Sequence, residues 1–171
     1  MNRRKLVALA ASAPLAMAQP GQRSLRERLL GSWKLISWEE TNPATGAVIY
    51  PCGKNATGRL MYDAAGRMAA QIMDPDRKNS GVTHADNPDY ARSVSAEDVV
   101  AAFTHYRAYY GAYAIDEVKR TVTHHVEGEL VPVNVGTDRV RNVGFLSDDR
   151  IVLTYPYNGR ENRLVWDRER P

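Results

Sequence analysis

The chain has 171 residues, of which 43% are apolar and 25% charged, and this composition is typical of one ordinary globular domain. Its 23 basic and 20 acidic side chains give a formal net charge of +3, but the first 18 residues hold three basic side chains and no acidic one. The remainder is balanced in charge, which argues against nucleic acid or an anionic membrane surface as the main partner. The single cysteine, Cys52, excludes an internal disulfide and a Cys-x-x-Cys zinc or redox pair.

Residues 1–18 have the three-part pattern of a signal peptide: Arg3, Arg4 and Lys5, then a short apolar run, then small residues ending at Ala18. The apolar run is too short to cross a bilayer as a helix, so we expect no stable membrane anchor. The alternative is a frayed N-terminal helix. If the segment is cleaved, the protein is exported, either periplasmic or secreted, by the general or the twin-arginine route. Residues 19–29 would then be a short lead-in that contains a helical turn, and 30–168 the folded domain.

From residue 30 onward, stretches rich in β-branched and aromatic residues alternate with Gly, Asn, Asp and Pro. This alternation is typical of antiparallel strands joined by turns. Tight turns at 42–46, 63–66 and 147–149 predict hairpins. The expected strands are 32–41, 48–51, 57–63, 67–74, 110–116, 121–129, 139–146, 150–155 and 160–167.

Residues 75–109 interrupt this series, first as a polar loop and then as a predicted helix. Ser95 followed by Asp98 is a capping-box pattern with Asp in place of the usual Glu. Apolar residues then recur at helical spacing, and we expect their stripe to close one end of the sheet or to pack against it. These residues are Val99, Phe103, Tyr106 and Tyr110.

Consecutive antiparallel strands of this number can close as a sandwich or as an up-and-down barrel, and hairpin-length connections favour the barrel. We therefore predict an all-β fold: an antiparallel up-and-down β-barrel of eight or nine strands with one helix inserted before the C-terminal half. A barrel of about eight strands has an interior that holds side chains or one small ligand.

The start of the first predicted strand, Gly31-Ser32-Trp33, resembles the Gly-x-Trp start of lipocalins. Further segments, in order and spacing, are similar to the lipocalin-like domain family of bacterial and fungal proteins, and the resemblance covers about residues 29 to 168. These segments are 30–37, 50–51, 58–63, 66–71, Tyr113, 123–127, 136–141 and 163–166.

The resemblance implies a barrel with an interior cavity for a small, largely apolar molecule, and some lipocalin relatives act as isomerases or cyclases. It also implies that Trp33 closes the floor of the barrel beneath an arginine of the last strand, a position that Arg163 would fill.

Strand alternation places Val122, His124, Val126 and Gly128 on one face, which we expect to point inward, and His125 and Glu127 on the other. An inward histidine is either a hydrogen-bonded structural residue or a general acid or base. Gln71 either fixes the polar end of a ligand or faces water from the outside. Arg139 and Arg141 either lie outward or enter the barrel, where each would need a carboxylate or an anionic ligand.

Five tyrosines offer aromatic area with hydroxyl tips, and Tyr62 and Tyr106 are the ones we expect at the cavity. The predicted function is therefore to bind a small apolar or amphipathic ligand inside the barrel. The ligand-binding residues would be Tyr62, Gln71, Tyr106, His124 and Arg141. The alternative is a cofactor-independent isomerase, cyclase or dehydratase that acts on a hydrophobic substrate in the same cavity, with His124 as the candidate catalytic residue.

The four histidines, His84, His105, His124 and His125, do not form a recognised metal-binding motif, so we expect no metal. The sequence also has no Gly-rich phosphate loop and no Gly-x-Ser-x-Gly nucleophile motif, and no cofactor is expected. The expected partner is a small hydrophobic molecule; the oligomeric state is not indicated.

Overall fold

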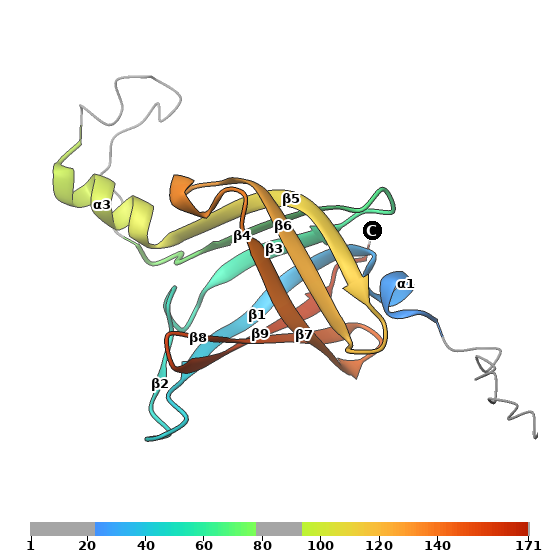
Figure 1. Ribbon diagram of the computed structural model, residues 1–171. Coiled ribbons are helices and arrows are strands. Elements are labelled where there is room, and N and C mark those ends of the chain that lie inside the picture. The colour runs from blue at the N-terminus through green and yellow to red at the C-terminus, as the bar shows by residue number, and fades with distance from the viewer. Residues whose placement is uncertain (1–22, 78–93, 171) are drawn as a thin grey trace, which may run out of the picture.

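The structure is a computed structural model that describes residues 23–77 and 94–170. Nine strands form one antiparallel sheet, and β1 pairs with β9 as well as with β3, which closes eight strands into a barrel (Figure 1). The extra strand, β2, pairs only with the last residues of β1. The predicted up-and-down barrel is thus confirmed. The strands are β1 Gly31–Thr41, β2 Val48–Ile49, β3 Thr57–Tyr62, β4 Arg67–Met73, β5 Tyr106–Asp116, β6 Thr121–Glu129, β7 Asp138–Ser147, β8 Arg150–Tyr157 and β9 Arg160–Arg168.

One boundary differs from the prediction by four residues: β5 begins at Tyr106 and not at Tyr110. The helix α3, Ala96–Thr104, does begin after Ser95, whose hydroxyl accepts a hydrogen bond from the Asp98 amide. It ends before Tyr106 because β5 pairs with β4 along the whole length of β4, as far as Met73 opposite Tyr106. The expected helical stripe is therefore wrong: Tyr106 and Tyr110 lie in a strand.

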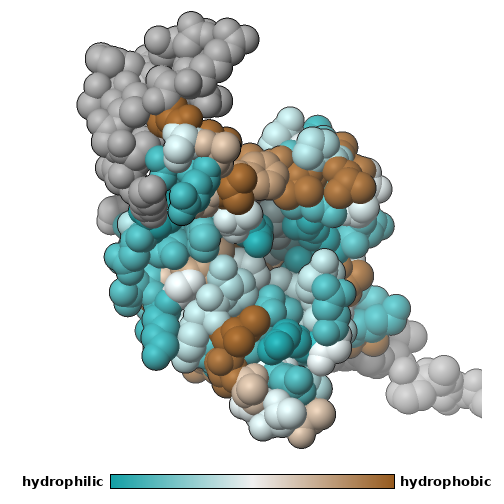
Figure 2. All heavy atoms as spheres, turned by 90° about the vertical axis from the view of Figure 1, so that its left-hand side faces the viewer, coloured by the Kyte–Doolittle hydropathy of each residue, from teal (hydrophilic) through white to brown (hydrophobic). Residues whose placement is uncertain are grey.

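The helix α3 also does not pack on the sheet as expected. None of its residues is buried, and Phe103 and Val100 are exposed. In Figure 1 the helix projects from one end of the barrel. Figure 2 looks onto this end and shows apolar side chains in a band over its upper rim, where α3 and the 3-10 turn η1, Pro132–Asn134, supply Val100, Phe103 and Val133.

The opposite end, which we call the closed end, is covered by α1, Leu25–Leu29. Ser24 and Glu27 form a reciprocal capping box at its start. Leu29 is fully buried, and its carbonyl accepts a hydrogen bond of 2.8 Å from the Trp33 indole. The Glu117 carboxylate, in the turn after β5, accepts hydrogen bonds from the Leu25 and Arg26 amides. These contacts hold the helix across the barrel.

The arginine above Trp33 is Arg168, and the expectation of Arg163 is wrong. The Arg168 guanidinium lies 4.1 Å from the centre of the Trp33 ring and donates to the carbonyls of Leu30 and Arg28. Arg163 lies outward, because it alternates with the buried Leu164 along β9. The register pairs Trp33 with Arg168 directly, which places the guanidinium over the indole.

The apolar core fills the barrel from the closed end upward. Inward residues of every long strand contribute to it, among them Leu35, Leu60, Met68, Val122, Val143, Ile151, Leu164 and Trp166. Within residues 23–77 and 94–170, no helix lies across the other end, which we call the open end. The two ends therefore differ: one is sealed by a helix, and the other is bordered by turns.

Candidate functional site

Polar side chains also line the interior, from Tyr62 at the closed-end terminus of β3 to Tyr155 near the open-end terminus of β8. We call this group the interior polar cluster; its members are Tyr62, Tyr109, His124, Arg141 and Tyr155. They come from five different strands that the barrel closure brings together. Three of them, Tyr109, Arg141 and Tyr155, are only half-buried, so solvent reaches the cluster.

His124 lies at the centre of the cluster and is 1% exposed. The Tyr62 hydroxyl lies 2.6 Å from its Nε2, and the Tyr109 hydroxyl 2.9 Å from its Nδ1. Burial, and then the positive charges of Arg141 and Arg139, lower the pKa of His124 from 6.5 to about 3. The imidazole is therefore neutral at physiological pH, with each ring nitrogen held by one tyrosine.

A neutral imidazole has one N–H donor and one acceptor nitrogen. One tyrosine hydroxyl therefore donates a hydrogen bond to His124. The other accepts a hydrogen bond from the imidazole N–H, and its own O–H can donate to a further partner. Burial raises the pKa of both Tyr62 and Tyr109, so both hydroxyls stay protonated. Tyr62 is 2% exposed, whereas Tyr109 is half-buried and in reach of solvent. The arrangement that satisfies the buried groups has Tyr62 donating to His124, which leaves the Tyr109 proton directed into the interior.

A bulge in β5 and β6 produces part of this arrangement. The pairing runs from Tyr110 opposite Gly128 to Gly111 opposite Val126, so β6 contributes one extra residue there. A Cβ on Gly111 would lie 1.9 Å from the His125 carbonyl oxygen, so only glycine fits. The shift reverses the inward alternation beyond the bulge: Glu129 turns inward opposite Tyr109, in place of the expected Gly128.

Glu129 then forms an ion pair with Arg139. The distance is 2.5 Å, and the side chains are only 5% and 22% exposed. The Arg139 guanidinium also lies 4.7 Å from the centre of the Tyr109 ring. The sequence left open whether Arg139 and Arg141 lie inside or outside the barrel. Arg139 lies inside, where Glu129 is its ion-pair partner.

Arg141 also enters the barrel, but no ion pair among the described residues joins it to a carboxylate. Its register partner is the buried Val122, and its guanidinium lies 3.6 Å from the centre of the Tyr155 ring. It donates a 3.0 Å hydrogen bond to the carbonyl of Val140, and its charge and hydrogen bonding at the Tyr109 hydroxyl oppose the rise that burial causes in the pKa of Tyr109. Burial raises the pKa of Tyr155 to about 12, an effect that the charge of Arg141 opposes. The cluster therefore contains a cation that stacks on an aromatic ring and forms no ion pair with a carboxylate in residues 23–77 and 94–170.

Asn162 adds an unpaired donor to the same region. It is fully buried, and its Oδ1 accepts a 2.9 Å hydrogen bond from the Trp38 indole. Its Nδ2 has no hydrogen-bond partner within the part of the chain that the structure describes. Asn162 is the register partner of Tyr155, so this free amide group lies beside the ring on which Arg141 stacks.

Two of the five expected ligand-binding residues, Gln71 and Tyr106, do not face the interior. Gln71 alternates with the buried Ala70 and Ile72 along β4, so it points outward. The Tyr106 hydroxyl donates to Gln71 Oε1 at 3.1 Å on this outer surface. The expectation for Tyr106 depended on a helix that ends before it. Tyr62, His124 and Arg141 do face the interior. There the Tyr62 hydroxyl contacts His124, and the Arg141 guanidinium stacks on the Tyr155 ring.

Sequence reasoning missed four interior residues: Tyr109, Glu129, Tyr155 and Asn162. Tyr155 and Asn162 could have been found, because they alternate with Leu153 and Leu164 on strands that were predicted. Tyr109 was assigned to the helical segment, and Glu129 turns inward only because of the bulge.

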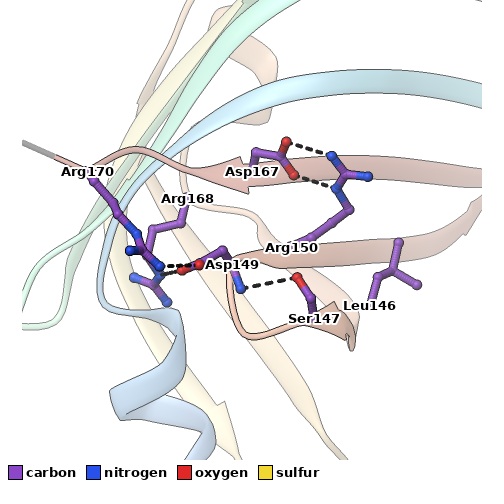
Figure 3. A pocket seen from close by; sticks show the side chains of 7 residues that line it. All are labelled: Leu146, Ser147, Asp149, Arg150, Asp167, Arg168 and Arg170. Carbon is purple, nitrogen blue, oxygen red and sulfur yellow. Dashed lines mark hydrogen bonds and ion pairs between the residues drawn. The ribbon is translucent and has the colours of Figure 1, made fainter.

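The closed end contains a separate cavity of about 410 Å³, shown in Figure 3. Its charged groups are paired: Arg150 makes two hydrogen bonds to Asp167, and Asp149 lies between Arg168 and Arg170. Because each carboxylate there already binds a guanidinium, this cavity offers structural ion pairs and no free donor set comparable to the interior polar cluster.

His125 lies outward, as expected, but its partner is Asp138 at 2.6 Å, while Glu127 binds Arg67. His84 and residues 1–22, including the predicted signal peptide, lie outside the described residues. Among the described residues, no group of three or more His, Cys, Asp and Glu side chains could hold a metal ion. No described helix is long and apolar enough to span a membrane.

Three solved structures match most of the chain at low sequence identity. A redesigned β-barrel matches with a TM-score of 0.42 and 9% identity, covering 86% of this chain and 96% of that one. A de novo designed fluorescence-activating β-barrel matches with a TM-score of 0.41 and 8% identity, covering 86% and 100%. A mutant of the fluorescent protein UnaG matches with a TM-score of 0.36 and 13% identity, covering 85% and 99%.

No curated protein is significantly similar to the chain in sequence. Residues 30–168 match the lipocalin-like domain family. The match spans the entire barrel, from the end of α1 to the end of β9. The Gly-x-Trp start, the Trp33 floor and the closed antiparallel barrel all agree with that match: the chain belongs to the lipocalin-like domain family.

Proposed function

We propose that this protein binds one small apolar or amphipathic molecule in the interior of its barrel, entering through the open end. The observation that supports this most directly is the half-buried state of Tyr109, Arg141 and Tyr155. These residues point into a closed barrel and yet are not fully enclosed, as is typical of residues that contact a ligand in a concave site.

The arrangement of surfaces in the interior also fits an amphipathic molecule. Apolar side chains such as Leu153 and Val143, which are register partners two residues closer to the closed end than Tyr155 and Arg141, lie below this part of the interior polar cluster. An apolar ligand would gain about 25 cal/mol for each Å² of apolar surface that it buries against them. Its polar end would meet the cluster, where a few placed donors fix orientation.

The alternative of proton-transfer catalysis by His124 finds less support. Both ring nitrogens are already bound to tyrosine hydroxyls, and burial keeps the pKa of His124 at about 3. A general base works best with a pKa near the operating pH and with a nitrogen free to reach the substrate. His124 is better suited to orienting Tyr109.

The proposal is tested by titrating the purified protein with N-phenyl-1-naphthylamine, an uncharged fluorescent probe of apolar sites, with native mass spectrometry for stoichiometry. We expect one molecule bound per chain. Tyr155→Ala should weaken binding, because it removes aromatic area from the interior. Tyr106→Ala is the matched control, since that ring lies on the outer surface. Absence of stoichiometric binding, or equal losses in both variants, would refute an interior site.

We also propose that the protein is exported and that residues 1–18 are removed during export, on the basis of their charge and apolar pattern. Intact-mass analysis of the cell fractions tests this. The expected species begins at Gln19 and lies outside the cytoplasm, whereas a full-length cytoplasmic chain would contradict the proposal.

A further inference from the structure

The interior toward the open end has more positive than negative charge. Strand alternation turns four arginines inward there, Arg107, Arg139, Arg141 and Arg160, and two carboxylates, Glu40 and Glu129. Glu129 is bound by Arg139, and no described ion pair joins Glu40 to any arginine. Even if Glu40 neutralised one cation, the interior would keep a positive excess.

An unpaired cation inside a protein is costly unless another group compensates its charge. For Arg141, the Tyr155 ring supplies only part of that compensation, because the contact is a cation–π interaction. Two neutral donors lie in the same region with hydrogen-bonding capacity to spare: the Tyr109 hydroxyl and Asn162 Nδ2. A guanidinium together with neutral donors is the donor set that binds an oxyanion.

Neither Glu129 nor the tyrosines of the cluster supply that oxyanion. Glu129 is 2.5 Å from Arg139 and is already engaged. Tyr62, Tyr109 and Tyr155 remain protonated because burial raises their pKa values. The cluster thus combines a fully buried amide nitrogen that has no described hydrogen-bond partner with a cation that forms no ion pair with a described carboxylate.

From this geometry we infer that the ligand is an anionic amphiphile, whose oxyanion head group, such as a carboxylate, binds the Arg141 guanidinium and the Tyr109 hydroxyl while its apolar part lies in the barrel. This inference rests on the proposed function and specifies its ligand class. His124 acts as a positioning residue: by donating its Nδ1–H to Tyr109, it directs the tyrosine proton toward the head group.

The experiment compares two competitors with the same alkyl chain, decanoate and 1-decanol, for displacement of N-phenyl-1-naphthylamine from the full mature chain. In the wild type, decanoate should displace the probe at concentrations at least about tenfold lower than decanol, because a charge-assisted hydrogen bond is worth about one to two orders of magnitude in affinity. Arg141→Met should abolish this preference, and Arg141→Lys should retain part of it.

Arg163→Met is the matched control. It removes the same net charge from the outer face of β9 and should leave the preference for decanoate unchanged. Tyr109→Phe should reduce the preference and keep probe binding, because it removes only the hydroxyl. Near-UV circular dichroism verifies that each variant is folded, and Arg141→Lys provides the test if Arg141→Met is not.

The outcomes separate the two proposals. If the probe binds and decanol displaces it as well as decanoate does, the interior binds apolar ligands and the anion inference is wrong. A preference for decanoate that survives in Arg141→Met also overturns it. If the wild type binds neither the probe nor decanoate, the proposed function itself fails.

Discussion

The arginines at the two ends of the barrel differ in their hydrogen-bond and ion-pair partners. At the closed end, Arg168 donates to two carbonyls, stacks on Trp33 and lies beside Asp149, and Arg150 is bound by Asp167. Toward the open end, Arg141 has an aromatic ring and no carboxylate. Arg168 and Arg141 both stack on aromatic rings, but only Arg168 also has the hydrogen-bond acceptors that satisfy a buried guanidinium.

This difference separates the parts of the molecule that maintain the fold from those available for binding. Paired charges and the packed Trp33 indole stabilise the closed end. The Trp166 indole nitrogen has no hydrogen-bond partner among the described residues, but it belongs to the apolar core cluster. In the interior polar cluster, unpaired donors and a cation occur together, at a cost in stability that a ligand would offset.

The largest effect should come from the closed end. Trp33→Ala removes a fully buried indole that packs against α1 and below Arg168, so we expect the free energy of unfolding to fall by about 3–5 kcal/mol. Urea denaturation followed by circular dichroism measures this. Trp38→Ala, at the level of Asn162, should cost less, because solvent can enter the space it leaves. Equal losses would mean that the two ends are packed alike.

Acidification should be the next largest effect. Below pH 6.5 the unfolded chain binds a proton on His124 that the folded chain does not bind until about pH 3. The unfolded state is therefore favoured as the pH falls through this window, by up to about 1.4 kcal/mol per pH unit. The stability contributed by neutral His124 is fully present above pH 6.5 and is lost toward pH 3.

Denaturation curves at several pH values test this with two variants. His124→Gln should flatten the fall in stability between pH 6.5 and pH 4, although its stability at pH 7 is lower because the tyrosine hydrogen bonds are disturbed. His125→Gln, at a neighbouring position on the outer face, should keep the wild-type slope. If His124→Gln leaves the slope unchanged, His124 is not held neutral by its surroundings.

Most of the fold could be predicted from the sequence, because strands with alternating patterns and short turns leave few closed arrangements. Eight of the nine predicted strands begin within one residue of the observed start. The exception, β5, shows the limit of local patterns: residues 106–110 match a helical stripe, yet pairing with β4 over seven residue positions makes them a strand. Tertiary pairing overrode the local pattern.

The site was less predictable because it depends on pairing details that the sequence does not display. Alternation correctly turned His124 inward, and it left the side of Arg141 open. It could not locate the bulge at Gly111 that turns Glu129 inward, so the pairing of Arg139 remained hidden. Without that pair, the contrast between a compensated Arg139 and an uncompensated Arg141 cannot be seen.

The difference between the two ends can be tested by substituting one arginine at each end, Arg168 and Arg141, by methionine. Arg168→Met removes hydrogen bonds to two carbonyls and the stacking on Trp33, and it leaves those part-buried acceptors unsatisfied. We expect a loss of about 2 kcal/mol in the free energy of unfolding. Lys at this position should recover little, because an ammonium cannot reproduce the planar, forked contact. A loss below about 0.5 kcal/mol would show that α1 closes the barrel without Arg168.

The smallest effect should come from Arg141→Met in the protein without ligand. The substitution gives up a cation–π contact with Tyr155, worth about 0.5–2 kcal/mol, but it also removes the cost of keeping an uncompensated guanidinium partly out of water. Because these two contributions oppose each other, we expect the free energy of unfolding to change by less than about 1 kcal/mol, in either direction. Decanoate should then stabilise the wild type against thermal unfolding more than it stabilises the variant, since the variant lacks the Arg141 guanidinium that the inference assigns to the head group. A large destabilisation by Arg141→Met without ligand would place Arg141 with Arg168 among the residues that maintain the fold, and the difference between the two ends would disappear.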